Sequence, residues 1–269
     1  MVSDRAGRTA VSVTRPCPRI MSIAGSDSGG GAGIQADIKT ITMLGGHAMT
    51  AITAITAQNT LGVQDVHQLP TEMILAQIES VVSDIGVDAV KIGMIGSAEA
   101  ARAVADYLDT LSIPIIFDPV MIATSGSVLA DRDTIAAFGK LMDVASVVTP
   151  NLPELEALGG IDAILGHGCH LVIKGGHGED RVVVDELYAP SGLIRRIEGK
   201  RFDTSETHGT GCTFASALAT GLGGGLDLVA AFEQAISFTR IAIIEAPGLG
   251  KGNGPLGHQF VTDFQDDDQ

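Results

Sequence analysis

The chain of 269 residues has no tryptophan, only 4% aromatic residues and three cysteines. The cysteines are isolated and show no metal-ligand spacing, which argues against a disulfide framework and fits a reducing compartment, the cytoplasm. No apolar run is long enough to span a membrane. Lys and Arg number 17 against 32 Asp and Glu, a net charge of −15, which disfavours nucleic acid as a partner.

Glycine is abundant instead, with 34 residues in a chain that is 45% hydrophobic. Short apolar runs alternate with amphipathic patterns, which indicates an α/β fold: a mostly parallel sheet covered by helices on both faces. We expect strands over 20–24, 47–56, 89–93, 113–118, 145–149 and 171–174. We expect helices over 32–44, 71–85, 98–108, 151–158, from Cys212 onward and over 226–246, and a hairpin-type insert over 181–188 and 193–202.

The chain is expected to form one domain over residues 19–260. Residues 1–18 are polar and lack the apolar region of a secretory signal, so we expect a disordered N-terminal extension. Residues 261–269 are acidic, and we expect a disordered tail there.

Residues 206–220 are the most informative stretch. Gly209, Thr210 and Gly211 form a glycine turn that opens a helix, whose unpaired N–H groups and dipole favour an anion such as phosphate. Cys212 lies on the first helical turn, where a thiol should ionise more easily than a free one. A small buried, inert thiol is the alternative, and His208 beside it is interpreted as a surface imidazole.

A second glycine stretch covers residues 24–37 and contains a loosened dinucleotide fingerprint, Gly31-Ala-Gly-Ile-Gln-Ala36. The fingerprint requires an acidic residue at the end of the next strand, and residues 50–60 contain none, so a dehydrogenase is disfavoured. A tight turn without a ligand is the other alternative. No Walker-type P-loop is present.

Several polar residues follow predicted strands, where parallel sheets bind ligands. Gln58 could pair with an aminopyrimidine edge or form an ordinary turn. Asp118 and Glu154 offer oxygen ligands for Mg²⁺, whereas Asn151 also fits a helix N-cap. Lys174 could neutralise phosphate or be a solvated strand-end lysine.

Taken together and in order, these motifs resemble bacterial hydroxymethylpyrimidine/phosphomethylpyrimidine kinases of the ribokinase superfamily, from about Ile20 to His258. The motifs are Ala24-Gly-Ser-Asp-Ser-Gly-Gly-Gly-Ala-Gly-Ile-Gln-Ala-Asp37, Ala57-Gln-Asn-Thr60, Lys91-Ile-Gly-Met94, Asp118-Pro-Val-Met121, Thr149-Pro-Asn-Leu-Pro-Glu154, Lys174-Gly-Gly-His177 and His208-Gly-Thr-Gly-Cys212.

The resemblance implies a ribokinase-like three-layer α/β/α fold and two ATP-dependent phosphorylations of 4-amino-5-hydroxymethyl-2-methylpyrimidine, in thiamine biosynthesis. Cys212 takes the place of the aspartate base of most relatives, Gly209 to Gly211 match the anion hole, and Lys174 matches a phosphate-contacting lysine. Asp118, Asn151 and Glu154 match the Mg²⁺-ATP region. A homodimer is also implied. The implied pyrimidine-binding positions are Gly25, Asp37, Gln58, Met94 and Val120.

One position departs from the family pattern, because Thr124 stands where relatives often have lysine. The rivals that stay open are a pyridoxal or pyridoxine kinase of the same superfamily, an enzyme that is bifunctional for both rings, and a non-catalytic pyrimidine sensor. The glycine-rich loop 248–257 is our candidate for the adenine pocket.

Overall fold

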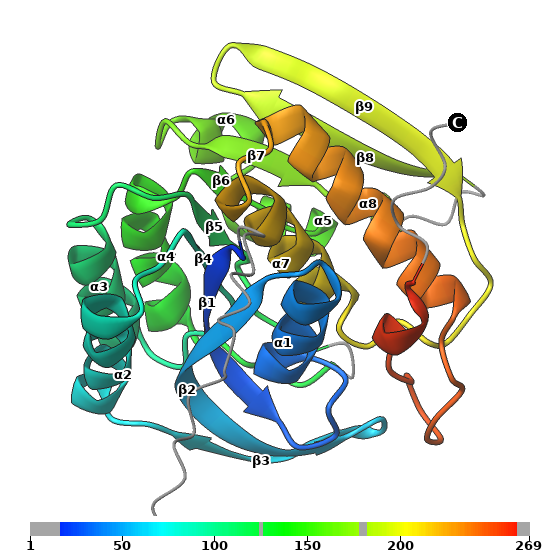
Figure 1. Ribbon diagram of the computed structural model, residues 1–269, viewed down its shortest axis with the longest axis horizontal. Helices are drawn as coiled ribbons and strands as arrows, with labels where there is room; N and C mark the ends of the chain where they lie inside the picture. Colours follow the sequence, from blue (N-terminus) through cyan, green and yellow to red (C-terminus); the bar gives the residue numbers. More distant parts are fainter. Residues whose placement is uncertain (1–16, 124–125, 178–181, 263–269) are drawn as a thin grey trace, which may run out of the picture.

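The computed structural model describes residues 17–123, 126–177 and 182–262. One nine-stranded sheet forms the middle of three layers, and helices cover both of its faces (Figure 1). The expected α/β/α architecture is confirmed. The predicted N-terminal extension and acidic tail lie largely outside the described residues, as does Thr124.

The strand order is β3-β2-β1-β4-β5-β6-β7-β8-β9. The six strands from β2 to β7 in this order run parallel, and β3, β8 and β9 are antiparallel to their neighbours. The strands are β1 (Arg19–Asp27), β2 (His47–Asn59), β3 (Gly62–Gln68), β4 (Ala89–Ile92), β5 (Ile115–Phe117), β6 (Val147–Val148), β7 (His170–Ile173), β8 (Val182–Ala189) and β9 (Gly192–Lys200).

Helices flank the sheet in two groups, each with its own apolar core. Helices α2, α3, α4 and α6 pack on one face, and α1, α7 and α8 on the other. The helices are α1 (Gly33–Met43), α2 (Thr71–Asp84), α3 (Ala98–Leu108), α4 (Arg132–Val144), α5 (Leu152–Ala157), α6 (Ile161–Leu165), α7 (Thr210–Gly223) and α8 (Leu228–Ile244), with short 3₁₀ turns η1 (Gly175–His177) and η2 (His258–Phe260).

The hairpin β8–β9 was expected as an insert, but it continues the sheet as its edge, because β8 pairs with β7. Strand β3 and helices α4 and α6 were not predicted. The folded part also passes the predicted boundary at residue 260, because Val261 is buried in the core against α7 and α8. Within the described residues, no helix is both long and apolar enough to cross a membrane.

The topology determines where a ligand can bind. The order of the strands reverses between β1 and β4, and the crevice beyond the carboxyl ends of such strands is where open α/β sheets hold ligands. Asp27 ends β1, Met94 follows β4, and Asp118 follows β5. The sheet therefore brings these three residues to one edge.

Candidate active site

A cavity of about 920 Å³ lies at this edge of the sheet. With one exception it is lined by every residue that the sequence proposed for the site: Gly25, Gln58, Met94, Asp118, Val120, Asn151, Glu154, Lys174, Gly209, Thr210, Gly211 and Cys212. The exception is Asp37.

Asp37 does not line the cavity, in contrast to the expected pyrimidine-binding position. Its fully buried carboxylate forms an ion pair with fully buried Lys91, at 2.9 Å. Ser22 and Ser216 also donate hydrogen bonds to it, at 2.5 and 2.7 Å. A buried charge needs this degree of compensation. Asp37 therefore joins α1, β1, β4 and α7 beneath the site instead of facing a ligand.

Two glycine loops close the cavity from one side by packing against each other. Gly209 has a φ of +88°, and a Cβ atom there would lie 1.9 Å from the carbonyl oxygen of Gly31. A Cβ atom at Gly31 would in turn lie 2.4 Å from the His208 ring. Only glycine allows this approach, which brings the start of α7 against the loop before α1.

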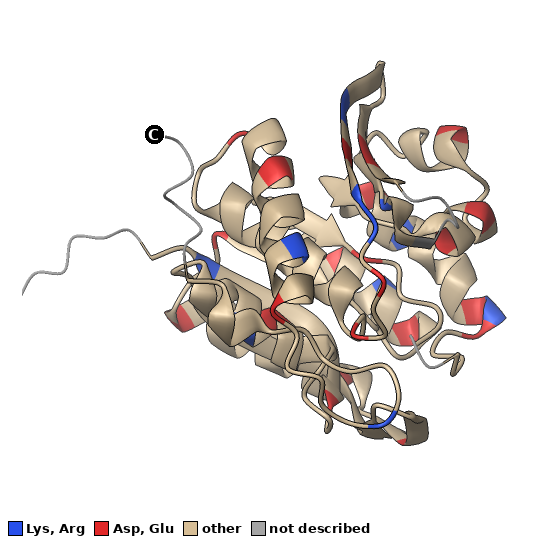
Figure 2. Ribbon diagram, turned by 90° about the vertical axis from the view of Figure 1, so that its right-hand side faces the viewer, with Lys and Arg blue, Asp and Glu red and all other residues tan. Residues whose placement is uncertain are grey.

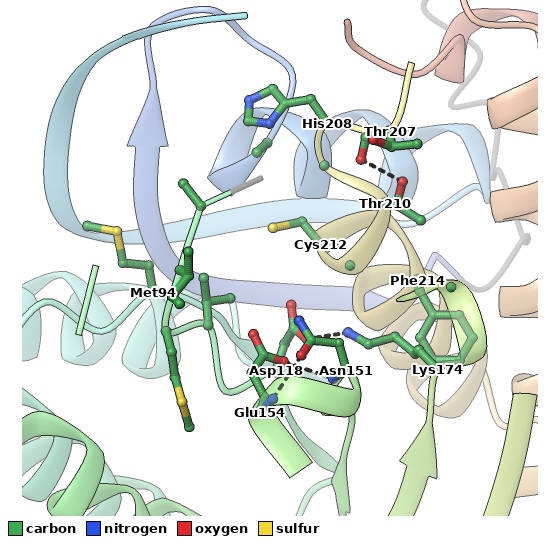
Figure 3. Close-up of a pocket in the computed structure, with 18 of the residues that line it drawn as sticks. Met94, Asp118, Asn151, Glu154, Lys174, Thr207, His208, Thr210, Cys212 and Phe214 are labelled. Carbon is green, nitrogen blue, oxygen red and sulfur yellow. Dashed lines mark hydrogen bonds and ion pairs between the residues drawn. The ribbon is translucent and has the colours of Figure 1, made fainter. Parts of the chain in front are cut away.

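The start of α7 has the features of an anion site. Within the described chain no side chain caps this helix, and Gly209 in a left-handed conformation is its N-cap. The first N–H groups of a helix lack intrahelical partners and carry positive potential, so they favour an anion. Figure 3 shows the Cys212 thiol directed into the cavity, on the side where Met94 lies.

The Cys212 thiol is harder to ionise than a free thiol, so the sequence-based expectation was wrong for the unliganded protein. Burial raises the pKa of Cys212 to about 11. Lys91 and the N–H of Gly33 favour the thiolate, whereas Asp37 and Asp118 oppose it. Desolvation and the two carboxylates outweigh these two favourable interactions.

Asp118 and Lys174 form an ion pair on the opposite side of the cavity (Figure 3). Lys174 Nζ lies 2.7 Å from Asp118 Oδ1, and the Thr149 hydroxyl donates to the same oxygen at 3.1 Å. The Lys174 side chain is only 14% exposed, so it is not a solvated strand-end lysine. A Cβ atom at Gly211 would lie 3.3 Å from Lys174 Nζ, which places this cation beside the start of α7.

Asn151 and Glu154 form a capping box at the start of α5. Glu154 N–H donates to Asn151 Oδ1 and Asn151 N–H donates to Glu154 Oε2, both at 2.9 Å. The predicted N-cap at Asn151 is confirmed. Burial raises the pKa of Glu154 to about 7, with Lys174 opposing the rise and Asp118 adding to it. The Glu154 carboxyl is thus held near the midpoint of its titration at neutral pH.

His208 is buried, at 7% exposure, and is not the surface imidazole that the sequence indicated. Its Nε2 atom lies 2.9 Å from Asp27 Oδ2 and 3.3 Å from Gln58 Nε2. Asp27 also accepts N–H groups of Gly29, Gly31 and Ala32. Burial opposes the ionisation of Asp27, but His208 and the N–H groups of Ala32 and Gly29 keep its pKa below the ordinary value.

The far end of the cavity is more apolar and was not predicted. It is lined by Phe214 of α7, by Val183 of β8 and by residues of α8: Ile236, Thr239, Arg240 and Ile243. The buried hydroxyl of Thr239 has no hydrogen-bond partner among the described residues. The loop 248–257 does not reach the cavity, because Gly250 and Gly252 pack on Thr60 and Gly254 packs on Glu206.

Cations are few around the site. Figure 2 shows Lys and Arg at a few separated places among Asp and Glu. Among the described residues, the cations that line the cavity are Lys174, Lys200, Arg201 and Arg240. Among the described residues no group of three or more His, Cys, Asp or Glu could enclose a metal ion. Two carboxylates, Asp118 and Glu154, suit Mg²⁺ shared with phosphates, which needs few protein ligands.

Comparison with known proteins identifies the family. A family model described as phosphomethylpyrimidine kinase matches residues 27–257. A hydroxymethylpyrimidine/phosphomethylpyrimidine kinase from Haemophilus influenzae is 43% identical over 258 residues, which cover 89% of this chain and 96% of that protein. A multifunctional thiamine biosynthesis protein from Corynebacterium efficiens is 42% identical, and the match covers 91% of this chain but only 36% of that protein.

Solved structures share the fold. An ADP complex of Bacillus subtilis pyridoxal kinase superposes with a TM-score of 0.83 at 32% identity, covering 91% of this chain and 98% of that one. Phosphomethylpyrimidine kinase from Clostridium difficile gives a TM-score of 0.72 at 37% identity, covering 84% and 99%. The protein therefore belongs to the phosphomethylpyrimidine kinase family.

Proposed function

We propose that this protein phosphorylates 4-amino-5-hydroxymethyl-2-methylpyrimidine with ATP, and then phosphorylates the monophosphate to the diphosphate, in thiamine biosynthesis. The observation that carries this proposal is the placement of Cys212. On the first turn of α7, it lines the same cavity as Gln58 and Met94, which we expect to bind the pyrimidine, and as Lys174, which we expect to bind phosphate.

The pyrimidine ring would lie against Gly25, Met94 and Val120, with its polar edge on Gln58. This places the hydroxymethyl oxygen at Cys212. Asp37 acts from beneath the site through its ion pair with Lys91. The apolar far end suits the adenine ring, where the unpaired Thr239 hydroxyl would find a partner.

The transferred phosphoryl group would lie at the N–H groups from Gly209 to Cys212, with Lys174 beside them. These groups stabilise the equatorial oxygens, and positioning of this kind provides most of the catalysis in phosphoryl transfer. Asp118 and Glu154 would hold Mg²⁺, and Asn151 keeps Glu154 in place through the capping box. When bound, Mg²⁺ neutralises charge on the phosphates.

Cys212 is proposed as the acceptor of the hydroxyl proton. The substrate oxygen forms a bond to the γ-phosphorus, the bond from this phosphorus to the bridging oxygen breaks, and ADP leaves. Only the thiolate of Cys212 can accept this proton, and with a pKa of about 11 the thiolate is a minor form of the free enzyme. Because such transition states need little activation of the nucleophile, a small thiolate fraction is compatible with this role.

The test measures ATP consumption with the free pyrimidine, its monophosphate and pyridoxal, each with product identification by mass. We expect turnover with the first two and little with pyridoxal. A preference for pyridoxal would identify the rival kinase, and no turnover would indicate a sensor.

Cys212→Ala should lower turnover at least a hundredfold while pyrimidine binding stays within a few-fold. Full turnover in this variant would refute the base role.

We also propose assembly as a homodimer, on family resemblance, and a cytoplasmic location, on the isolated cysteines. Size-exclusion chromatography with light scattering tests the dimer, and a monomer at micromolar concentration would contradict it.

A further inference from the structure

His208 lies between two residues of the pyrimidine side of the cavity, and the hydrogen atoms there can be assigned. Asp27 accepts three backbone N–H groups, so its carboxylate acts only as an acceptor toward His208 Nε2, 2.9 Å away. His208 Nε2 must therefore carry a hydrogen atom. A protonated Nε2 cannot accept from the amide nitrogen of Gln58, although this nitrogen lies 3.3 Å away.

The contact of the Gln58 amide with Thr56, on its other side, also determines which way the amide is turned. The Thr56 hydroxyl lies 2.9 Å from the carbonyl oxygen of Ser26 and 3.0 Å from Gln58 Oε1. The Ser26 carbonyl has no hydrogen atom, so the single hydroxyl hydrogen goes to it. The Thr56 oxygen is then an acceptor toward Gln58. Both neighbours favour the amide turned by 180°, with the NH₂ group donating to the Thr56 oxygen and Oε1 facing His208. The one Nε2 hydrogen of His208 goes mainly to Asp27 at 2.9 Å, and Oε1 receives its weaker share at 3.3 Å in place of a contact between two donors.

This orientation decides which ring the site can accept. The hydroxymethyl group of the substrate must point at the start of α7, where Cys212 lies, and His208 is the residue just before that start. In the aminopyrimidine, the 4-amino group is bonded to the ring carbon beside the hydroxymethyl carbon, so it donates toward the His208 side of Gln58. In pyridoxal, the corresponding neighbour is an aldehyde oxygen, which is an acceptor.

We propose that His208, anchored by Asp27, is a specificity-determining residue: it fixes the carbonyl oxygen of Gln58 toward α7 and thereby selects a ring with a hydrogen-bond donor beside its hydroxymethyl group. The inference rests on the proposed function, since it names how that site distinguishes pyrimidine from pyridoxal. His208 acts through Gln58 and is a positioning residue. Pyridoxal would place its aldehyde oxygen opposite the carbonyl oxygen of Gln58. This contact is unfavourable, because neither oxygen carries a hydrogen atom to donate.

The test compares three acceptors on the full-length enzyme with saturating Mg²⁺-ATP. They are the 4-aminopyrimidine alcohol, the same pyrimidine alcohol without its 4-amino group, and pyridoxal. His208→Phe keeps a ring but removes the N–H donor, and His208→Gln retains a donor as the matched control. Because all acceptors are assayed on one preparation, ratios of kcat/KM do not depend on the fraction of folded enzyme.

We expect wild type to prefer the 4-aminopyrimidine over the desamino compound by about 10- to 100-fold. In His208→Phe this preference should fall below about threefold, mainly through KM, and the relative kcat/KM for pyridoxal should rise. His208→Gln should retain most of the preference. His208→Leu removes the same hydrogen without a ring and should behave as His208→Phe does.

Equal losses of kcat/KM for all three acceptors in His208→Phe and His208→Leu would make His208 a purely structural residue and overturn the inference. Values of kcat/KM that stay at the wild-type level for all three acceptors would overturn it as well. Either outcome leaves the proposed function standing, which fails separately if wild type does not phosphorylate the aminopyrimidine.

Discussion

At the scale of single residues, the titration of Cys212 can be measured directly. Because burial raises the pKa of the thiol to about 11, the rate of alkylation by iodoacetamide in the ligand-free enzyme should rise roughly tenfold per pH unit between pH 7.5 and 10. Cys17 is exposed, so the experiment uses a Cys17→Ser background, and Cys212→Ala provides the blank. A plateau below pH 8 would show an easily ionised thiol instead.

Glu154 gives a second prediction, on stability. Its folded-state pKa of about 7 lies above the ordinary value of 4.5, so its favourable contribution is complete below pH 4.5 and is lost as the pH rises to 7. Glu154→Gln removes this loss and keeps the capping box, since glutamine also accepts the Asn151 N–H.

Without Mg²⁺ or ATP, urea unfolding should therefore find Glu154→Gln more stable than wild type at pH 8, by roughly 1–3 kcal/mol. At pH 4 the two proteins should be nearly equal. A variant that is less stable at pH 8 would mean that Glu154 is ionised in the fold at little cost.

At the scale of elements, the contact between the two glycine loops predicts a large effect of a single methyl group. Gly209→Ala adds both a strained φ of +88° and a collision with the Gly31 carbonyl oxygen. Gly225→Ala is the matched control, with a φ of +89° and nothing within 4 Å of the added atom. We expect the control to lose about 1 kcal/mol and Gly209→Ala at least about 2 kcal/mol more, with loss of turnover.

Urea unfolding and turnover measure both variants. Equal destabilisation of the two would mean that the loops can move apart, which would contradict the packing described above.

Most elements were predicted from the sequence because their patterns are local. Helix α3 spans the predicted residues, Ala98–Leu108, and the Ser97 side chain caps its N-terminus by accepting from the Ala100 N–H. Strand β3 was missed because five of its seven residues are exposed, so it lacks the alternation of a buried strand. Helix α4 did carry a signal, an apolar face behind the N-cap Asp131, which the interpretation overlooked.

The site shows where local patterns stop being informative. The positions of the glycine turn before α7 and of the strand-end residues on one cavity follow from sequence, because strand ends of a parallel sheet share an edge. The burial of His208 and the raised pKa of Cys212 do not. Each depends on groups from distant parts of the chain, namely Asp27 and Gly31 for His208, and Asp37 and Asp118 for Cys212.

At the scale of the whole molecule, one buried histidine links the end of the described chain to the active-site helix. His258 of η2 is 1% exposed, and its Nε2 lies 2.8 Å from the Thr213 hydroxyl of α7. Burial, with a smaller effect of Lys39, lowers the pKa of His258 to about 4. The folded protein therefore holds this imidazole neutral.

Between pH 6.5 and 4 the unfolded chain binds a proton at His258 that the folded protein does not. The contribution to stability is therefore complete above pH 6.5 and is lost as the pH falls to 4, by up to about 3 kcal/mol. His258→Gln, which keeps an acceptor for Thr213, should reduce the dependence of the unfolding free energy on pH in this window. Urea unfolding at pH 4.5, 5.5 and 7 measures it, and an unchanged dependence would exclude His258 as its source.

The packing of Gly31 on Gly209 also bears on how such a cavity can acquire new substrates. The loop before α1 and the turn that opens α7 touch at these two glycines without an intervening side chain, so neither backbone can shift alone. A change of ring preference must therefore arise by exchanging side chains on a fixed frame. Proteins of this fold that prefer different rings should therefore differ in the side chains that line the cavity, while the lengths of these two loops stay the same.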